Sequence, residues 1–116
     1  MSAAQKKKPL TLAEVKSIVF ERWSRNMAEL SIDQKRLLHY LSKFTRVEDP
    51  IRAREAVNQL TEKFGLSEEH AIMLVNVIPS SVEELKAYLY KDYPLLTQEN
   101  YKEMLSILKS LVEEGE

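Results

Sequence analysis

Residues 64–91 read FGLSEEHAIMLVNVIPSSVEELKAYLYK, and the pattern predicts a helix, a tight corner and a second helix. Gly65 suits the left-handed backbone conformation at which a preceding helix often ends. Ser67 is a good N-cap because its hydroxyl can accept a hydrogen bond from a free N–H group in the next turn. Residues 71–78 are apolar on nearly every side, which is typical of a helix buried at the centre of a domain.

A second helix follows the corner. Pro79 cannot continue the first helix, and Ser81 has Glu84 at the spacing of a capping box. The apolar residues after the cap form one stripe, made of Val82, Leu85, Tyr88 and Leu89. Because a short helix gains most of its stability from packing, the rest of the chain is expected to supply other helices around this pair.

The composition favours a single all-α domain. Of the 116 residues, 44% are hydrophobic and 30% are charged, which is enough to fill a core and stay soluble. The chain has two glycines and four prolines, and most of them fall at expected helix ends. The absence of cysteine excludes disulfides, thiolate zinc sites and cysteine nucleophiles, and it suits a reducing compartment such as the cytoplasm. No apolar run approaches the roughly 20 residues that span a bilayer.

Charge is distributed unevenly along the chain. Residues 1–63 hold 13 Lys and Arg against 8 Asp and Glu, whereas residues 64–116 hold 4 against 10. The basic half suits nucleic acid, and the acidic half suits a basic partner. An ordinary solvated surface explains the same counts equally well, so charge alone leaves the choice open.

The first helix is expected from about Leu12 to Met27, after a polar tail over residues 1–9. Thr11 and Glu14 have the spacing of a capping box. The helix carries an apolar stripe at helical spacing, made of Leu12, Val15, Ile18, Val19 and Trp23. This stripe suits docking onto the protein's own core and presentation to another chain equally, although an exposed tryptophan is typical of an interface anchor.

Three further helices are expected, each from a capping residue. They run from Ser31 to about Thr45 or Arg46, from Asp49 to about Phe64, and from Thr97 to about Val112. Pro50 strengthens the second of these starts because proline is favoured at the first helical position. The inward residues of the first are expected to be Leu37, Leu38, Leu41 and Phe44. The whole pattern predicts a compact, all-helical scaffold of six capped helices.

Nothing in the sequence predicts an enzyme, a cofactor or a bound metal. His39 has no cysteine, histidine or paired carboxylate at ligand spacing, so a place on the surface is expected. His70 lies beside Glu68 and Glu69, but a single histidine there is no catalytic arrangement. The sequence has no Gly-rich phosphate loop, no zinc-protease motif and no Ser-His-Asp set at a supporting spacing.

Several blocks carry a family resemblance. They are LTLAEVK at residues 10–16, LLHYLSKF at 37–44, FGLSEEHA at 64–71, IP at 78–79, VEEL at 82–85 and LYK at 89–91. In order and spacing they resemble the F-type subunit of archaeal RNA polymerase, the counterpart of the fourth subunit of eukaryotic RNA polymerase II. The resemblance covers the chain from Leu10 to Val112, and the run of blocks is more specific than any one of them.

The resemblance implies a two-part body without catalytic residues, in which an N-terminal arm and helix precede a compact orthogonal bundle of about five helices. Residues 1–29 would form a tail and a partner-binding helix, and residues 30–113 a bundle similar to the helicase-and-RNase-D C-terminal domain. The partner would be the E-type subunit of the polymerase, which joins the pair to the core polymerase as a stalk beside the RNA exit channel. The family contributes to transcription initiation, DNA opening and contact with emerging RNA.

Two surfaces are expected on this basis. The partner surface is expected at Leu10, Leu12, Val15, Ile18, Val19 and Trp23, and the segment Pro9–Leu12 is a candidate for adding an extended strand to the partner. A weak, sequence-independent contact with RNA phosphates is assigned to Lys35, Arg36, Lys43, Arg46, Arg52 and Arg54. Arg52 and Arg54 sit near a helix start, where cations oppose the helix dipole. The aromatic residues that would stack bases are not interleaved with these cations.

Two other classes of function stay open. A free-standing helical nucleic-acid-binding accessory domain is compatible with the same fold, because a fold does not settle function. The slightly negative net charge and the acidic second half count against it. An enzyme would need a deep pocket with a perturbed acid or base, and no candidate pair is present. Tight binding of nucleic acid by the isolated chain would favour the accessory domain over the polymerase component.

Overall fold

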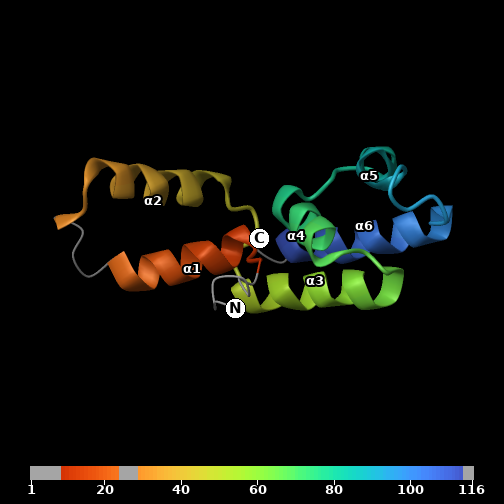
Figure 1. Cartoon of the computed structure of the whole chain (residues 1–116), viewed down its shortest axis with the longest axis horizontal. Helices are drawn as coiled ribbons and strands as arrows, with labels where there is room; N and C mark the ends of the chain where they lie inside the picture. Colours follow the sequence, from red (N-terminus) through yellow and green to blue (C-terminus); the bar gives the residue numbers. More distant parts are fainter. Residues whose placement is uncertain (1–8, 24–28, 114–116) are drawn as a thin grey trace, which may run out of the picture.

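The computed structural model describes residues 9–23 and 29–113, and its regular elements are all helices (Figure 1). They are α1 (Leu12–Trp23), α2 (Ile32–Phe44), α3 (Pro50–Phe64), α4 (Glu68–Val77), α5 (Val82–Leu89) and α6 (Gln98–Glu113). No strand occurs in either described range. The predicted all-α class is therefore confirmed.

The helix caps that the sequence predicts are formed. Ser31 accepts from the N–H of Gln34, whose side chain accepts in return from the N–H of Ser31. Asp49 accepts from two N–H groups at the start of α3, which has proline at its first position. Gly65 ends α3 with a φ of 74°, in the left-handed region that glycine tolerates. These ends are local features, so short sequence patterns place them well.

Two details at helix ends differ from the prediction, and a third prediction is not tested. α2 ends one to two residues early because Thr45 has an extended backbone. Before α5, Ser81 accepts from the N–H of Glu84 as expected, but the Glu84 carboxylate accepts from Ser80 instead of Ser81. Residues 24–27, predicted as the last turn of the first helix, lie outside the described residues.

Helices α3 to α6 share one hydrophobic core. α4 contributes four buried residues to it, Ala71, Ile72, Leu74 and Val75, as its nearly all-round apolar sequence predicts. α3 packs on both α4 and α6, and α6 packs in turn on α5. These four helices form the right-hand part of the molecule in Figure 1.

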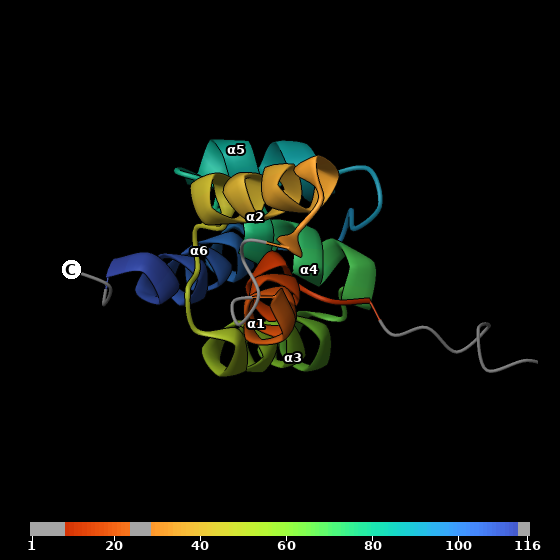
Figure 2. The same ribbon diagram turned by 90° about the vertical axis from the view of Figure 1, so that its left-hand side faces the viewer.

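The first two helices form a hairpin that extends away from this bundle. In Figure 1, α2 lies along α1 at the left, and only the start of α1 reaches α3 and α4. Figure 2 views the hairpin from its far end and shows α2 on the same side of the molecule as α5, with α1 between α2 and α3. The division into residues 1–29 and 30–113 stays a prediction, and its boundary falls within this hairpin.

Candidate partner interface

The apolar stripe of α1 is only partly covered by the rest of the chain. One side of α1 packs on α2 and α3, and Ala13 is its buried residue. Of the six residues predicted for a partner surface, Leu10 and Ile18 are exposed over 39% and 48% of their area. The other four are less exposed, namely Leu12, Val15, Val19 and Trp23. The structure thus gathers all six on or just before one helix and turns two of them to solvent.

Hydrogen bonds within the chain argue against strand addition by the segment Pro9–Leu12. The Pro9 carbonyl accepts from Arg54 at 2.8 Å, and the Thr11 N–H donates to the glutamate of its own capping box at 2.8 Å. The Leu12 N–H donates to the Asn76 amide oxygen at 2.9 Å. A strand added to a partner would need such groups free, so this segment serves instead to start α1 on the bundle.

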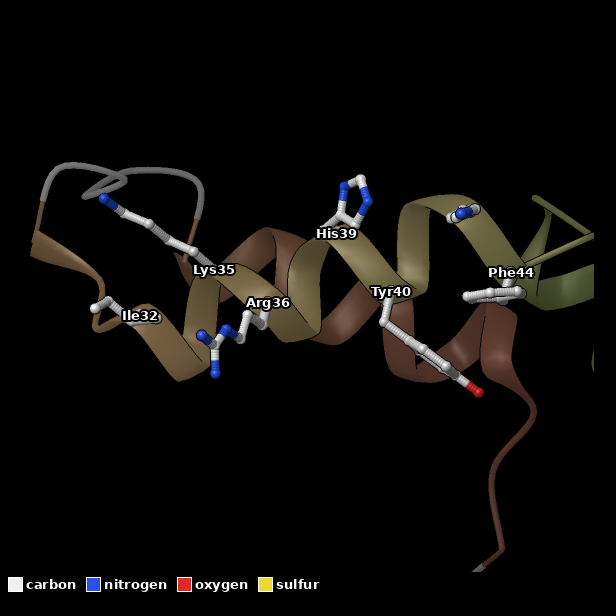
Figure 3. A pocket seen from close by; sticks show the side chains of 7 residues that line it. Ile32, Lys35, Arg36, His39, Tyr40 and Phe44 are labelled. Carbon is white, nitrogen blue, oxygen red and sulfur yellow. The ribbon is translucent and has the colours of Figure 1, made fainter.

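α2 exposes a mixed apolar and cationic surface that faces away from α1 (Figure 3). We name it the α2 outer face, and it consists of the residues lining a shallow, open hollow: Ile32, Lys35, Arg36, His39, Tyr40, Lys43 and Phe44. Ile32 is 69% exposed, Tyr40 50% and Phe44 49%. Large apolar side chains this exposed are typical of a surface that another molecule covers.

The prediction that Leu37 and Phe44 point inward is wrong. Both are exposed, whereas Leu38 and Leu41 are buried as expected. The reason is that α2 packs mainly on α1, and one neighbouring helix covers a narrower stripe than the four residues occupy.

Aromatic and cationic side chains alternate on the α2 outer face. The ring centroids of Tyr40 and Phe44 are 4.8 Å apart, with 42° between the ring planes. Lys43 Nζ lies 5.6 Å from the Phe44 centroid, within the range of a cation–π contact. The expectation that aromatic residues are not interleaved with the cations is therefore wrong for this helix, where Lys43 follows Tyr40 by three residues and directly precedes Phe44.

The six cations assigned to RNA contact fall into two groups. Lys35, Arg36 and Lys43 lie on the α2 outer face, where the only ion pair among described residues is an exposed one of 3.8 Å from Arg36 to Asp33. An exposed pair of that length contributes little. The other three cations, all arginines outside α2, donate hydrogen bonds within the chain.

Arg46 caps the C-terminus of α4. Its guanidinium donates to the carbonyls of Val77 and Ile78 at 2.6 and 3.2 Å. These carbonyls lie at the end of the helix and would otherwise lack hydrogen-bond partners. Ile78 has a φ of 47°, rare for a β-branched residue, and the following Pro79 disfavours the helical alternative. Arg52 makes a comparable contact at 3.0 Å to the Ser110 carbonyl of α6. No short-range sequence pattern predicts these partners.

Arg54 is the most engaged of the six. Its Nε and Nη2 donate to the two Glu14 carboxylate oxygens at 3.0 and 2.7 Å, and its Nη1 donates to Glu68 at 2.7 Å. Nη2 also donates to the Pro9 carbonyl. The side chains of Arg54 and Glu14 are only 15% and 17% exposed. Their hydrogen bonds lower the pKa of Glu14 and raise the pKa of Arg54. Two carboxylates therefore offset the unfavourable position of this cation near a helix start.

Glu14 is expected to make folding stability depend on pH. Because its folded-state pKa lies below the ordinary 4.5, its contribution is fully present above that value and is lost as the pH falls through the folded-state pKa. We expect Glu14→Gln to flatten the acid limb of the unfolding free energy, measured by urea denaturation between about pH 3 and pH 7. Glu62→Gln, at an exposed position of α3, is the control and should follow the wild type. If the unfolding free energies of wild type and Glu14→Gln changed in parallel with pH, the expectation would be contradicted.

The two histidines differ in their surroundings. His39 is exposed, as predicted. His70 Nδ1 lies 2.6 Å from the Tyr93 hydroxyl and 2.9 Å from the Ser67 hydroxyl, and Nε2 lies 3.5 Å from Asp92. This cluster links the start of α4 to the loop after α5.

Within the described ranges, no group of three or more His, Cys, Asp or Glu could hold a metal ion, and no helix is long and apolar enough to cross a membrane.

Comparison with known proteins identifies the family. The family model for RNA polymerase Rpb4 matches residues 4–112. The chain belongs to the RNA polymerase Rpb4 family. It is 30% identical over 104 residues to DNA-directed RNA polymerase subunit Rpo4 of Methanocaldococcus jannaschii, covering 89% of this chain and 84% of that protein. The predicted resemblance to an archaeal RNA polymerase component is thereby confirmed.

In this Rpb4-family chain the exposed apolar residues concentrate on the hairpin. The exposed large hydrophobic residues of the described part are Leu10, Ile18, Ile32, Leu37, Tyr40 and Phe44 in the hairpin region, and Ile51, Tyr88, Tyr90 and Leu95 elsewhere. The hairpin region is less than half of the described chain but holds six of these ten side chains. An element that leaves so much apolar surface uncovered is typical of one that docks on a partner.

Proposed function

We propose that this chain is a non-catalytic stalk component of DNA-dependent RNA polymerase that binds the E-type subunit through the α1–α2 hairpin. The observation that carries the proposal is the concentration of exposed apolar side chains on that hairpin. Family membership supports the polymerase context. The resemblance to the F-type subunit supplies the partner, the position beside the RNA exit channel, the role in initiation and the cytoplasmic location.

The proposed interface combines the α1 stripe with the α2 outer face. Tyr40 and Phe44 form an aromatic pair on the outer face, and buried aromatics are frequent anchors of protein interfaces. The cations around them, such as Arg36 and Lys43, suit an acidic rim on the partner. The apolar centre would supply most of the affinity, and the charged rim would supply orientation and association rate.

Co-expression with the E-type subunit tests the proposal. We expect size-exclusion chromatography with light scattering to show a one-to-one complex that survives about 1 M salt, because apolar contacts are not screened. Two separate peaks at micromolar concentration would contradict the assignment. A chain lacking residues 1–29 is expected to lose binding, and full affinity in that variant would contradict the role of the α1 stripe.

Contact with nascent RNA is an alternative use of the α2 outer face, because Tyr40 and Phe44 cannot both anchor the partner and stack bases. Lys35, Arg36 and Lys43 can approach phosphates, while Tyr40 and Phe44 offer rings on which bases can stack. The arginines outside α2 are already bonded within the chain, so we assign the contact to the three cations of α2.

Charge reversal on α2 tests the RNA contact. Lys35→Glu, Arg36→Glu and Lys43→Glu together, in the isolated chain, are expected to lower the salt dependence of its weak RNA affinity by about 2 in log–log slope. A matched control reverses the exposed lysines Lys86, Lys91 and Lys102. An unchanged slope in the α2 variant would exclude the contact. Tight RNA binding by the isolated chain would instead favour a free-standing accessory domain.

A further inference from the structure

We propose that Arg54 is a positioning residue that fixes the direction in which the α1–α2 hairpin leaves the bundle, and that this direction sets the affinity for the partner. The part concerning affinity rests on the proposed function above. The part concerning direction rests on the hydrogen bonds of Arg54 alone and is tested without a partner.

Arg54 joins three other segments at one point. It lies on α3, Glu14 lies on α1, Glu68 lies on α4, and the Pro9 carbonyl belongs to the segment before α1. Glu14 is in turn bonded to the N–H and hydroxyl of Thr11, which is fully buried. A side chain bonded to three separate segments restricts their relative orientation, and this one acts where α1 meets the bundle (Figure 1).

Other ties between the hairpin region and the bundle lie at the same end of the hairpin. The Leu12 N–H donates to Asn76 near the start of α1, and the guanidinium of Arg46 reaches the end of α4 from just after α2. Both ties are at the end of the hairpin nearest the bundle (Figure 1). A helix of 12 residues is about 18 Å long, so a rotation of about 10° at its base moves the far end by about 3 Å. Such a displacement exceeds what a closely packed interface tolerates.

The geometry requires arginine rather than any cation. Nε, Nη1 and Nη2 each donate, and together they reach two carboxylates and one carbonyl. A lysine would keep the charge, but its single ammonium group cannot present the planar fork that binds Glu14 in two places. Arg54→Lys therefore loses the contacts that fix the direction of the hairpin, while it keeps the positive charge.

Distance measurements on the free protein test the positioning. The chain has no cysteine, so Ser42→Cys on α2 and Ser106→Cys on α6 give two unique, exposed spin-label sites. We expect a narrow distance distribution by double electron–electron resonance in the otherwise native chain and a broader or shifted one with Arg54→Lys. Lys63→Gln, which removes the exposed Lys63–Glu103 ion pair between α3 and α6, is the control and should leave the distribution unchanged. An unchanged distribution in the Arg54→Lys protein would overturn the proposal.

Binding to the E-type subunit tests the consequence. We expect unlabelled Arg54→Lys to bind at least about tenfold more weakly than wild type, with Lys63→Gln as the same control. Glu68→Gln removes only the more exposed arm, and a smaller loss in the same direction is expected. Equal affinity of wild type and Arg54→Lys would overturn the link from direction to affinity. If the wild type itself failed to bind this partner, the proposed function would fail, while the distance measurement would still decide the positioning.

Discussion

Substitution of Tyr40 and Phe44 by aspartate is expected to weaken the complex with the E-type subunit about a thousandfold. Aromatic anchors typically cost about 2 kcal/mol each when they are lost, and about 4 kcal/mol corresponds to that change in affinity. The fold should persist, because both side chains are about half exposed in the free chain and lie outside the shared core. Isothermal titration calorimetry gives the affinity, and circular dichroism checks the helix content.

The matched control introduces the same charge at a distant exposed hydrophobic residue. Leu95, in the loop before α6, is 91% exposed, and Leu95→Asp is expected to bind the partner as wild type does. Wild-type affinity in the Tyr40 and Phe44 variant would show that the α2 outer face is not part of the interface. Ile18→Asp would then decide whether the α1 stripe alone carries the contact.

Helix ends can be predicted from the sequence because their causes are local. The hydroxyl of Ser31, the carboxylate of Asp49 and the positive φ of Gly65 each act within one turn of their own helix. The fully apolar character of α4 likewise predicts a buried position whichever helices surround it. The family resemblance rests on the same capped blocks, which is why the sequence alone carries it.

The candidate interface can be predicted only in part because exposure depends on neighbours that are distant in sequence. Periodicity places Phe44 inward, but it cannot report that α2 has one main neighbour instead of three. Charge counting groups six cations, but the partners of Arg54 lie 40 residues before it and 14 after it. The unfavourable position of Arg54 near a helix start is visible in the sequence. The partners of Arg54, and hence its role, cannot be predicted from the sequence.

Leu74→Ala is expected to destabilise the protein by about 3 kcal/mol, within the range of about 2–5 kcal/mol for such core truncations. Leu74 lies within α4, is fully buried, and belongs to the core that α3 to α6 share. The loss combines the transfer energy of the removed atoms with the cavity that remains. A domain of this size has a total stability of about 5–15 kcal/mol, so the melting temperature should fall by roughly 10–15 °C.

Leu95→Ala provides the matched control, because it is the same substitution at a residue that is 91% exposed, and a change within about 0.5 kcal/mol is expected there. Urea denaturation of both variants gives the two values under one set of conditions. Equal stability of the two variants would contradict the central place of α4 in the core. If Leu74→Ala lost much of its unfolding free energy and still bound the E-type subunit with unchanged affinity at low temperature, that result would show that the bundle supplies stability and the hairpin supplies recognition.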